Sequence, residues 1–171
     1  YDVGPELKIH EKSPFKDQKC HPNCDCGRYL EIANSVFMQY QKQTDGSLIE
    51  LKQKSVDFGG GLERMAAATE NTPDIFKTDL FAPIISVTET ISGKHYGQNE
   101  GTTQAMRIVA DHLKGAVMMM ADGVLPSNKM QGYVLRRLIR RALFYGRKLG
   151  LLKEWNYVGQ QIVIRSRGEP I

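Results

Sequence analysis

The spacing of apolar residues changes near residue 75, and this change constrains the fold more than any other feature. Before it, residues 28–42 alternate between two faces, as in an extended strand. A turn signal at residues 44–46 and a second extended segment at residues 47–51 predict an antiparallel hairpin. After residue 75, apolar residues recur every three or four positions, which is typical of helices. The sequence therefore predicts an α+β fold, with an antiparallel part followed by an all-α part.

Residues 55–58 read as a further short strand, broken by Gly59-Gly60-Gly61 and followed by a helix over residues 62–69. Later helices are expected over residues 79–92, 103–121, 128 or 129–149, and 155–165. Gly93, Gly123 and Gly150 follow three of them as stop signals. The inward faces of the two long helices are expected to carry Met106, Val109, Leu113, Ala116, Val117 and Met120 in the first, and Met130, Val134, Leu138 and Leu143 in the second.

Composition excludes fibrous, disordered and membrane-spanning classes. Hydrophobic residues make up 41% of the 171 residues and charged residues 25%. No apolar run approaches the roughly 18 residues that a membrane span requires. The three cysteines, Cys20, Cys24 and Cys26, form one odd-numbered cluster, which favours a reducing compartment over a disulfide framework. We therefore expect a cytoplasmic protein with no membrane partner.

Basic residues are concentrated in one stretch, although the net charge is only +4. Residues 123–153 contain no Asp or Glu, and they carry Lys129, Arg136, Arg137, Arg140, Arg141, Arg147, Lys148 and Lys153. Arg136 and Arg140 are four residues apart, as are Arg137 and Arg141, so a helix presents them as two adjacent stripes. Such stripes suit contacts with phosphates. A solvated helix face, or pairing with acids elsewhere, is the alternative.

The segment Asp57-Phe58-Gly59-Gly60-Gly61-Leu62-Glu63-Arg64 has the chemistry of a nucleotide site. Glycines allow a ligand to approach the backbone closely, and the helix start that follows offers unpaired N–H groups. Arg64 in the first turn can reach a phosphate. Taken alone, such a turn is more often a tight connection, and the two common phosphate-loop patterns are absent.

Residues 57–64 are, however, very similar to motif 3 of class II aminoacyl-tRNA synthetases, which ends in Gly-Leu-Glu-Arg. Neighbouring segments resemble the alanyl-tRNA synthetase family and occur in its order. They are Arg28-Tyr-Leu-Glu-Ile-Ala-Asn-Ser-Val-Phe-Met-Gln-Tyr, Ile108-Val-Ala-Asp-His-Leu, Ala121-Asp-Gly-Val-Leu-Pro-Ser-Asn and Gly132-Tyr-Val-Leu-Arg-Arg-Leu-Ile-Arg-Arg-Ala. The chain therefore resembles an internal part of an alanyl-tRNA synthetase over nearly its whole length.

The resemblance implies part of a ligase that activates alanine with ATP and Mg²⁺ and transfers it to the 3′ end of tRNA(Ala). Residues 1–75 would be the C-terminal part of the class II catalytic domain with its antiparallel sheet. Residues 76–171 would begin the helical domain that recognises the tRNA acceptor stem. Motifs 1 and 2 are not in this sequence, so we expect it to form no alanyl-adenylate alone. A non-catalytic, synthetase-derived RNA-binding module is the alternative.

The resemblance also implies functional residues. Asn34, Val36, Asp57 and Gly59 would line the alanine pocket; Gly59, Gly61, Glu63 and Arg64 would bind ATP; and Asp57 and Arg64 would be catalytic. The tRNA-binding residues would be Asn128, which matches a position implicated in recognising a G·U pair, with Arg136, Arg137, Arg140 and Arg141. Simpler structural roles compete: a turn or helix cap for Asp57 and Asn128, a hydrogen-bonded polar residue for Asn34, and a first-turn carboxylate for Glu63.

Two features depart from the family pattern or extend it. Ala33, Phe58 and Gly60 stand where the family commonly has Trp, Thr and Met. Cys20, Cys24 and Cys26 are interpreted by default as free thiols; their spacing is also compatible with zinc, with His10 or His21 as a fourth ligand. Some relatives have a further cysteine where this chain has Phe15.

Overall fold

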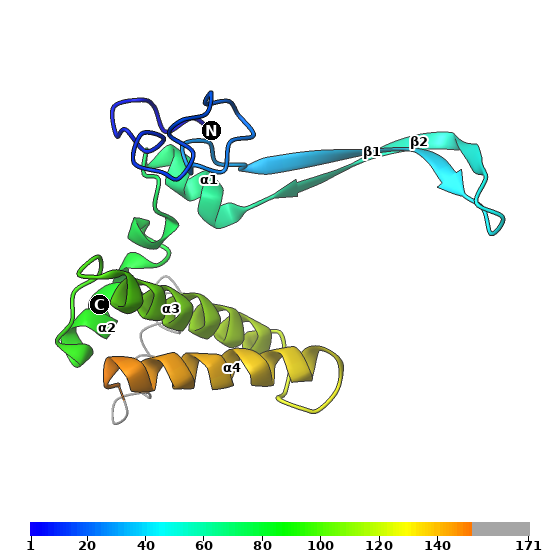
Figure 1. The fold of residues 1–171 in the computed structure, drawn as a ribbon. Helices are drawn as coiled ribbons and strands as arrows, with labels where there is room; N and C mark the ends of the chain where they lie inside the picture. The colour runs from blue at the N-terminus through cyan, green and yellow to red at the C-terminus, as the bar shows by residue number, and fades with distance from the viewer. Residues whose placement is uncertain (152–171) are drawn as a thin grey trace. The chain divides into compact units, whose positions relative to one another are not determined.

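The computed structural model describes residues 1–151 (Figure 1). They fall into two units, residues 1–78 and residues from Asp79 onward. The expected helix over residues 155–165 lies outside the described residues. Among those described, no helix combines the length and hydropathy needed to cross a lipid bilayer.

A long antiparallel hairpin, β1 (Ala33–Lys42) and β2 (Leu48–Gly60), dominates the first unit (Figure 1). Its turn contains Gly46 at φ +88°, a backbone conformation that favours glycine. The expectation of two separate short strands at residues 47–51 and 55–58 was wrong. The pairing continues on both sides of an irregularity between Met38 and Tyr40, so β2 is one strand of 13 residues.

The strand expected over residues 55–58 was also predicted to end before Gly59-Gly60-Gly61. Instead, β2 continues to Gly60, because Gly59 and Gly60 pair with residues of β1. The next amide, Gly61 N–H, donates to the Ile32 carbonyl at 3.0 Å. Helix α1 (Leu62–Thr69) then follows with the predicted bounds, and Ala67 is its buried residue. A short 3-10 helix, η1 (Ile75–Lys77), begins after Asp74, whose side chain accepts from the Phe76 N–H.

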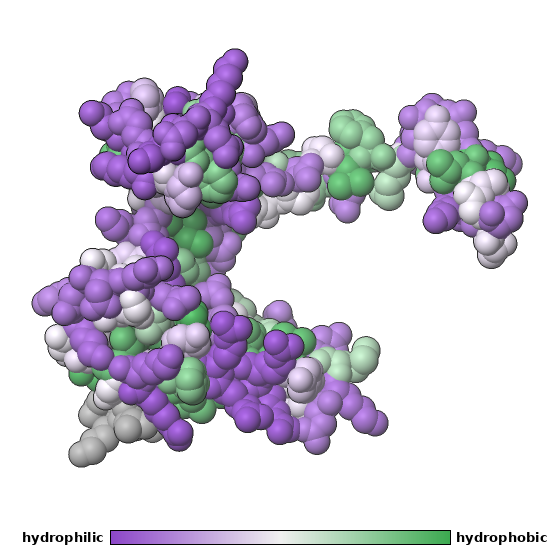
Figure 2. Space-filling model, in the orientation of Figure 1, coloured by the Kyte–Doolittle hydropathy of each residue, from purple (hydrophilic) through white to green (hydrophobic). Residues whose placement is uncertain are grey.

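The hairpin exposes large apolar side chains on both faces. Figure 2 shows apolar groups along it, interrupted by polar ones. Phe37 is 76% exposed and Phe58 65% exposed, and they share one face; Val36 lies on the other and is also exposed. Because an isolated two-stranded hairpin is only marginally stable in water, these surfaces suit burial against further protein.

The described part of the second unit, residues 79–151, contains three α-helices: α2 (Ala82–Ser92), α3 (Glu100–Ala121) and α4 (Met130–Leu149). Gly93 and Gly150 follow α2 and α4 with φ of +65° and +94°, as their positions in the sequence predicted. Helix α3 begins earlier than expected because the Asn99 side chain caps it, accepting from the Thr102 N–H at 2.8 Å. Helices α3 and α4 run antiparallel, side by side (Figure 1).

The buried face of α4 differs from the expected one. Met130 is 79% exposed and Val134 48% exposed, and Leu143 is also exposed. The buried residues are instead Gly132, Leu135, Ala142, Gly146 and Leu149. Small side chains let two helices approach closely, so the tightest contact need not use the bulkiest residues. On α3 the prediction is confirmed for Met106, Val109 and Ala116, which are buried, whereas Met120 is exposed and Ala105 and Ala110 are buried as well.

Candidate functional site

The four residues assigned to the alanine pocket lie together on one face of the hairpin. The register pairs Asn34 with Gly59. It also pairs Val36 with Asp57. Directly opposed residues of antiparallel strands share a face, as do residues two apart on one strand, so all four side-chain positions form one contiguous patch. All four residues are exposed.

The three departures from the family pattern lie on the opposite face. Ala33 pairs with Gly60, and Phe58 is two residues before Gly60 on the same strand. A Cβ added at Gly60 would come within 3.3 Å of the Phe58 ring and 3.1 Å of Met65 Cε. The departures therefore alter the far side of the hairpin and leave the Asn34–Gly59 side unchanged.

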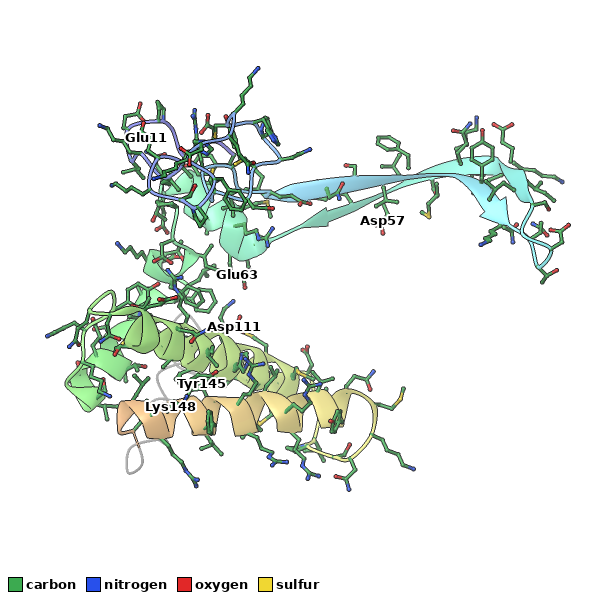
Figure 3. All side chains as sticks on the ribbon, in the orientation of Figure 1. Glu11, Asp57, Glu63, Asp111, Tyr145 and Lys148 are labelled. Carbon is green, nitrogen blue, oxygen red and sulfur yellow. The ribbon has the colours of Figure 1, made fainter. Side chains whose placement is uncertain are left out.

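Arg64 lies at the base of the hairpin, where its Nη1 donates to the Glu31 carbonyl at 2.9 Å. Within residues 1–151, Asp57 and Arg64 form no ion pair with each other, and both are exposed. Figure 3 shows Asp57 and Glu63 directed to the same side of the first unit. The Gly61 N–H already donates to the Ile32 carbonyl. A ligand could therefore approach the Gly61 backbone closely, but it could not accept a hydrogen bond from that N–H.

An open depression of about 660 Å³ adjoins Asn34, one of the four residues of the expected alanine pocket. Its lining includes Tyr29, Glu31 and Asn34 from the entry to β1, and Cys24 from the preceding loop. Neither Asp57 nor Arg64 lines it. The depression therefore connects the Asn34 end of the patch with the cysteine-containing loop.

The outer face of α4 carries cations interleaved with aromatic rings. Arg136, Arg137, Arg140 and Arg141 are all exposed, and within residues 1–151 none of them forms a salt bridge with an acidic group. Pairing with acids in the described part of the chain is therefore ruled out.

Aromatic side chains support these cations. Arg137 lies 5.8 Å from the Tyr133 ring, and Lys148 lies 4.9 Å from the Phe144 ring and 5.1 Å from the Tyr145 ring (Figure 3 labels Tyr145 and Lys148). These are cation–π distances. These aromatic partners were not among the residues predicted from the sequence. Their spacing of three or four residues from the cations on one helix is the signal that identifies them.

Asn128 lies in the loop before α4 and does not cap the helix. The N-cap is Lys129, and it makes no side-chain capping bond. The Asn128 side-chain oxygen accepts instead from Arg136 Nη1, one of the exposed arginines. The loop itself packs against Gly132, since a Cβ there would come within 2.5 Å of the Leu125 carbonyl oxygen.

The cysteine cluster is compact, and its fourth member is His10. One ligand atom each from His10, Cys20, Cys24 and Cys26 lies within 4.8 Å of all the others. His21 is directed elsewhere, and its Nδ1 accepts from the Asn23 N–H at 3.2 Å. The Arg28 backbone N–H and hydrogen bonds within the cluster lower the pKa of the Cys26 thiol to about 7.

The antiparallel hairpin, the Gly-Leu-Glu-Arg segment and the helical unit are consistent with one region of a class II synthetase. The family described as tRNA synthetases class II (A) matches residues 1–169, and the chain belongs to this family. The similar curated relatives are alanine–tRNA ligases. That of Desulfosudis oleivorans is 50% identical over 78% of this chain. That of Borreliella afzelii is 52% identical over 86% of this chain. That of Treponema denticola is 48% identical over 85%.

The chain spans only part of these relatives. It covers 15% of the Desulfosudis protein, 25% of the Treponema protein and 26% of the Borreliella protein. The family assignment thus concerns one region of a longer kind of protein.

Proposed function

We propose that this chain is the region of an alanine–tRNA ligase that completes the alanine pocket and begins the acceptor-stem domain. Residues 1–75 belong to the catalytic domain in this proposal, and residues 76–171 belong to the helical domain. The observation that carries the proposal is the hairpin register. It pairs Asn34 with Gly59 and Val36 with Asp57 on one exposed face.

Each member of this patch has a chemical task toward alanine. The Asp57 carboxylate pairs with the substrate ammonium, and the Asn34 amide hydrogen-bonds the amino acid. Val36 supplies an apolar wall. Gly59 leaves room for the substrate methyl, because a Cβ added there would meet nothing within 4 Å.

ATP binds next to this patch in the proposal, at Gly59, Gly61, Glu63 and Arg64. Class II synthetases use ATP with Mg²⁺, which neutralises phosphate charge. The Arg64 guanidinium adds positive charge where the phosphates carry negative charge. Its bond to the carbonyl of Glu31, two residues before β1 begins, holds it at the base of the hairpin.

The outer face of α4 binds the acceptor stem of tRNA(Ala). Exposed arginines suit phosphates, and the adjacent rings offer surfaces for stacking. Asn128 presents an amide near this face, and its contact with Arg136 joins the loop to the basic stripe. An amide can both donate to and accept from a base edge in the shallow RNA groove.

The test of the alanine pocket is an Asp57→Asn change in the full-length protein. Loss of one partner of an enclosed charge pair costs about 2–5 kcal/mol, so kcat/KM for alanine in ATP–pyrophosphate exchange should fall roughly 30-fold or more. Glu50→Gln is the matched control, because it makes the same change on the same hairpin at a carboxylate that pairs with Lys54 at 2.7 Å. Equal activity of the Asp57 and Glu50 variants would refute the assignment.

The exposed cationic face of α4 also supports a second candidate, a non-catalytic RNA-binding module. The same assay separates the two functions. A module would bind an acceptor minihelix through α4, yet the full-length protein would show no alanine-dependent exchange at all. A ligase shows both activities.

A further inference from the structure

We propose that His10, Cys20, Cys24 and Cys26 bind one structural Zn²⁺ that holds together the loop region before the hairpin. This inference is independent of the proposed function, because it concerns the stability of residues 1–32. The sequence left the fourth ligand open between His10 and His21, and the geometry selects His10.

Two of the distances between ligand atoms are close to those of a tetrahedral zinc site, and all four ligand atoms lie within 4.8 Å of one another. Zn–S bonds of about 2.3 Å and a Zn–N bond of about 2.0–2.1 Å place two ligating sulfurs about 3.8 Å apart, and a sulfur and a nitrogen about 3.6 Å apart. Cys20 Sγ and Cys26 Sγ are 4.0 Å apart. Cys24 Sγ and His10 Nδ1 are 3.6 Å apart.

The histidine is oriented for metal binding. His10 Nε2 lies 2.9 Å from the Gln18 carbonyl oxygen, which can only accept a hydrogen bond. Nε2 therefore carries the proton, and Nδ1, the nitrogen that faces Cys24, has its lone pair free. Metal-binding histidines typically have such a backbone partner on the second nitrogen, which fixes the tautomer and the ring orientation.

The three thiols form no disulfide bond in this arrangement. All three are free, and Cys20 Sγ and Cys26 Sγ are 4.0 Å apart, about twice a disulfide bond length. On binding Zn²⁺, the thiols become thiolates and release their protons to solvent. A Cys₃His set closes a four-coordinate structural site with no open position.

The loop region needs such a support because it has almost no core. Residues 1–27 contain turns but no helix or strand, and Val3 and Cys26 are their only buried residues. Small structures of this kind are usually stabilised by metals or disulfides. The loops also lead into the hairpin. The Val3 N–H donates to the Arg28 carbonyl at 3.0 Å, and the Arg28 side chain forms a bidentate ion pair with Asp2.

The test is metal analysis of the 171-residue chain and of the full-length protein, first stripped with a chelator and then reconstituted with Zn²⁺ or Co²⁺. The chain should bind one Zn²⁺, and Co²⁺ should give the intense absorption of a tetrahedral thiolate site. His10→Ala and Cys24→Ser should lose this metal in both proteins. His21→Ala, the matched control, should keep it.

A variant that conserves the ligand type guards against simple misfolding. His10→Cys should retain one metal and shift the Co²⁺ spectrum toward that of a four-thiolate site. Absence of bound metal in the reconstituted wild-type chain would overturn the proposal. So would equal metal content in the His10→Ala and His21→Ala variants. Both readouts are independent of alanine activation.

Discussion

Replacing Gly59 by Ala adds one methyl group to the hairpin face that carries Asn34, Val36 and Asp57. The chain itself accommodates this group, because nothing lies within 4 Å of the added Cβ and the Gly59 φ is not positive. Folding should therefore be unaffected or slightly favoured, by about 0.4–1 kcal/mol, since Ala reduces the entropy of the unfolded chain.

The cost should appear in substrate binding. The new methyl would occupy the space that the proposal assigns to the methyl of alanine. Pockets discriminate a single methyl or methylene by about 1–3 kcal/mol, so kcat/KM for alanine should fall roughly 10- to 200-fold. Glycine lacks that methyl, so its activation should fall much less, and the preference for alanine over glycine should narrow.

The assay is ATP–pyrophosphate exchange by the full-length protein with alanine and with glycine, alongside thermal unfolding. Gly60→Ala is the matched control, because it makes the same change one residue later on the opposite face. Its added Cβ meets Met65 and Phe58, so its effect should be on stability. An unchanged alanine-to-glycine ratio in the Gly59 variant would refute the assignment of this face as the alanine pocket.

Three other outcomes are expected. The double variant Arg136→Ala/Arg140→Ala should bind a minihelix of the tRNA(Ala) acceptor stem more weakly, and it should lower the slope of log Kd against log salt concentration by about 1–2. The control variant Lys42→Ala should leave this slope unchanged. Equal slopes for the double variant and the wild-type protein would exclude α4 as the RNA site. Gly132→Ala should destabilise the helical unit by about 1–3 kcal/mol in chemical denaturation, because its Cβ would come within 2.5 Å of the Leu125 carbonyl oxygen; wild-type stability would contradict this packing. Residues 1–171 alone should show no alanine-dependent exchange, and detectable exchange would contradict the need for the rest of the catalytic domain.

The sequence predicted local elements better than it predicted their partners. The bounds of α1 follow from the spacing of its apolar residues, and the glycine stops of α2 and α4 follow from capping chemistry. That Asn34 and Val36 share a face also follows from spacing alone. That they face Gly59 and Asp57 does not. The register depends on the irregularity opposite Gln39, and a shift of one residue would move Asp57 to the other side.

The wrong or undecided predictions share a physical cause. Contacts between segments that are distant in the sequence depend on how their surfaces fit together in three dimensions. On α4, bulky residues were expected inside, but the buried positions include Gly132, which the loop at Leu125 and Ser127 covers, together with Ala142 and Gly146. In the loop region, the spacing of the cysteines could not distinguish His10 from His21, because the choice depends on the path of the turns between them.

The packing of Phe58 over Gly60 has a consequence for how this variant of the family can change. A methionine at position 60 and a phenyl ring at position 58 would compete for one volume beside Met65. Changing only Gly60 to the family's methionine would overfill this space, and changing only Phe58 to the family's threonine would leave it empty. We therefore expect positions 58 and 60 to be coupled, so that related chains contain the paired states more often than the mixed ones.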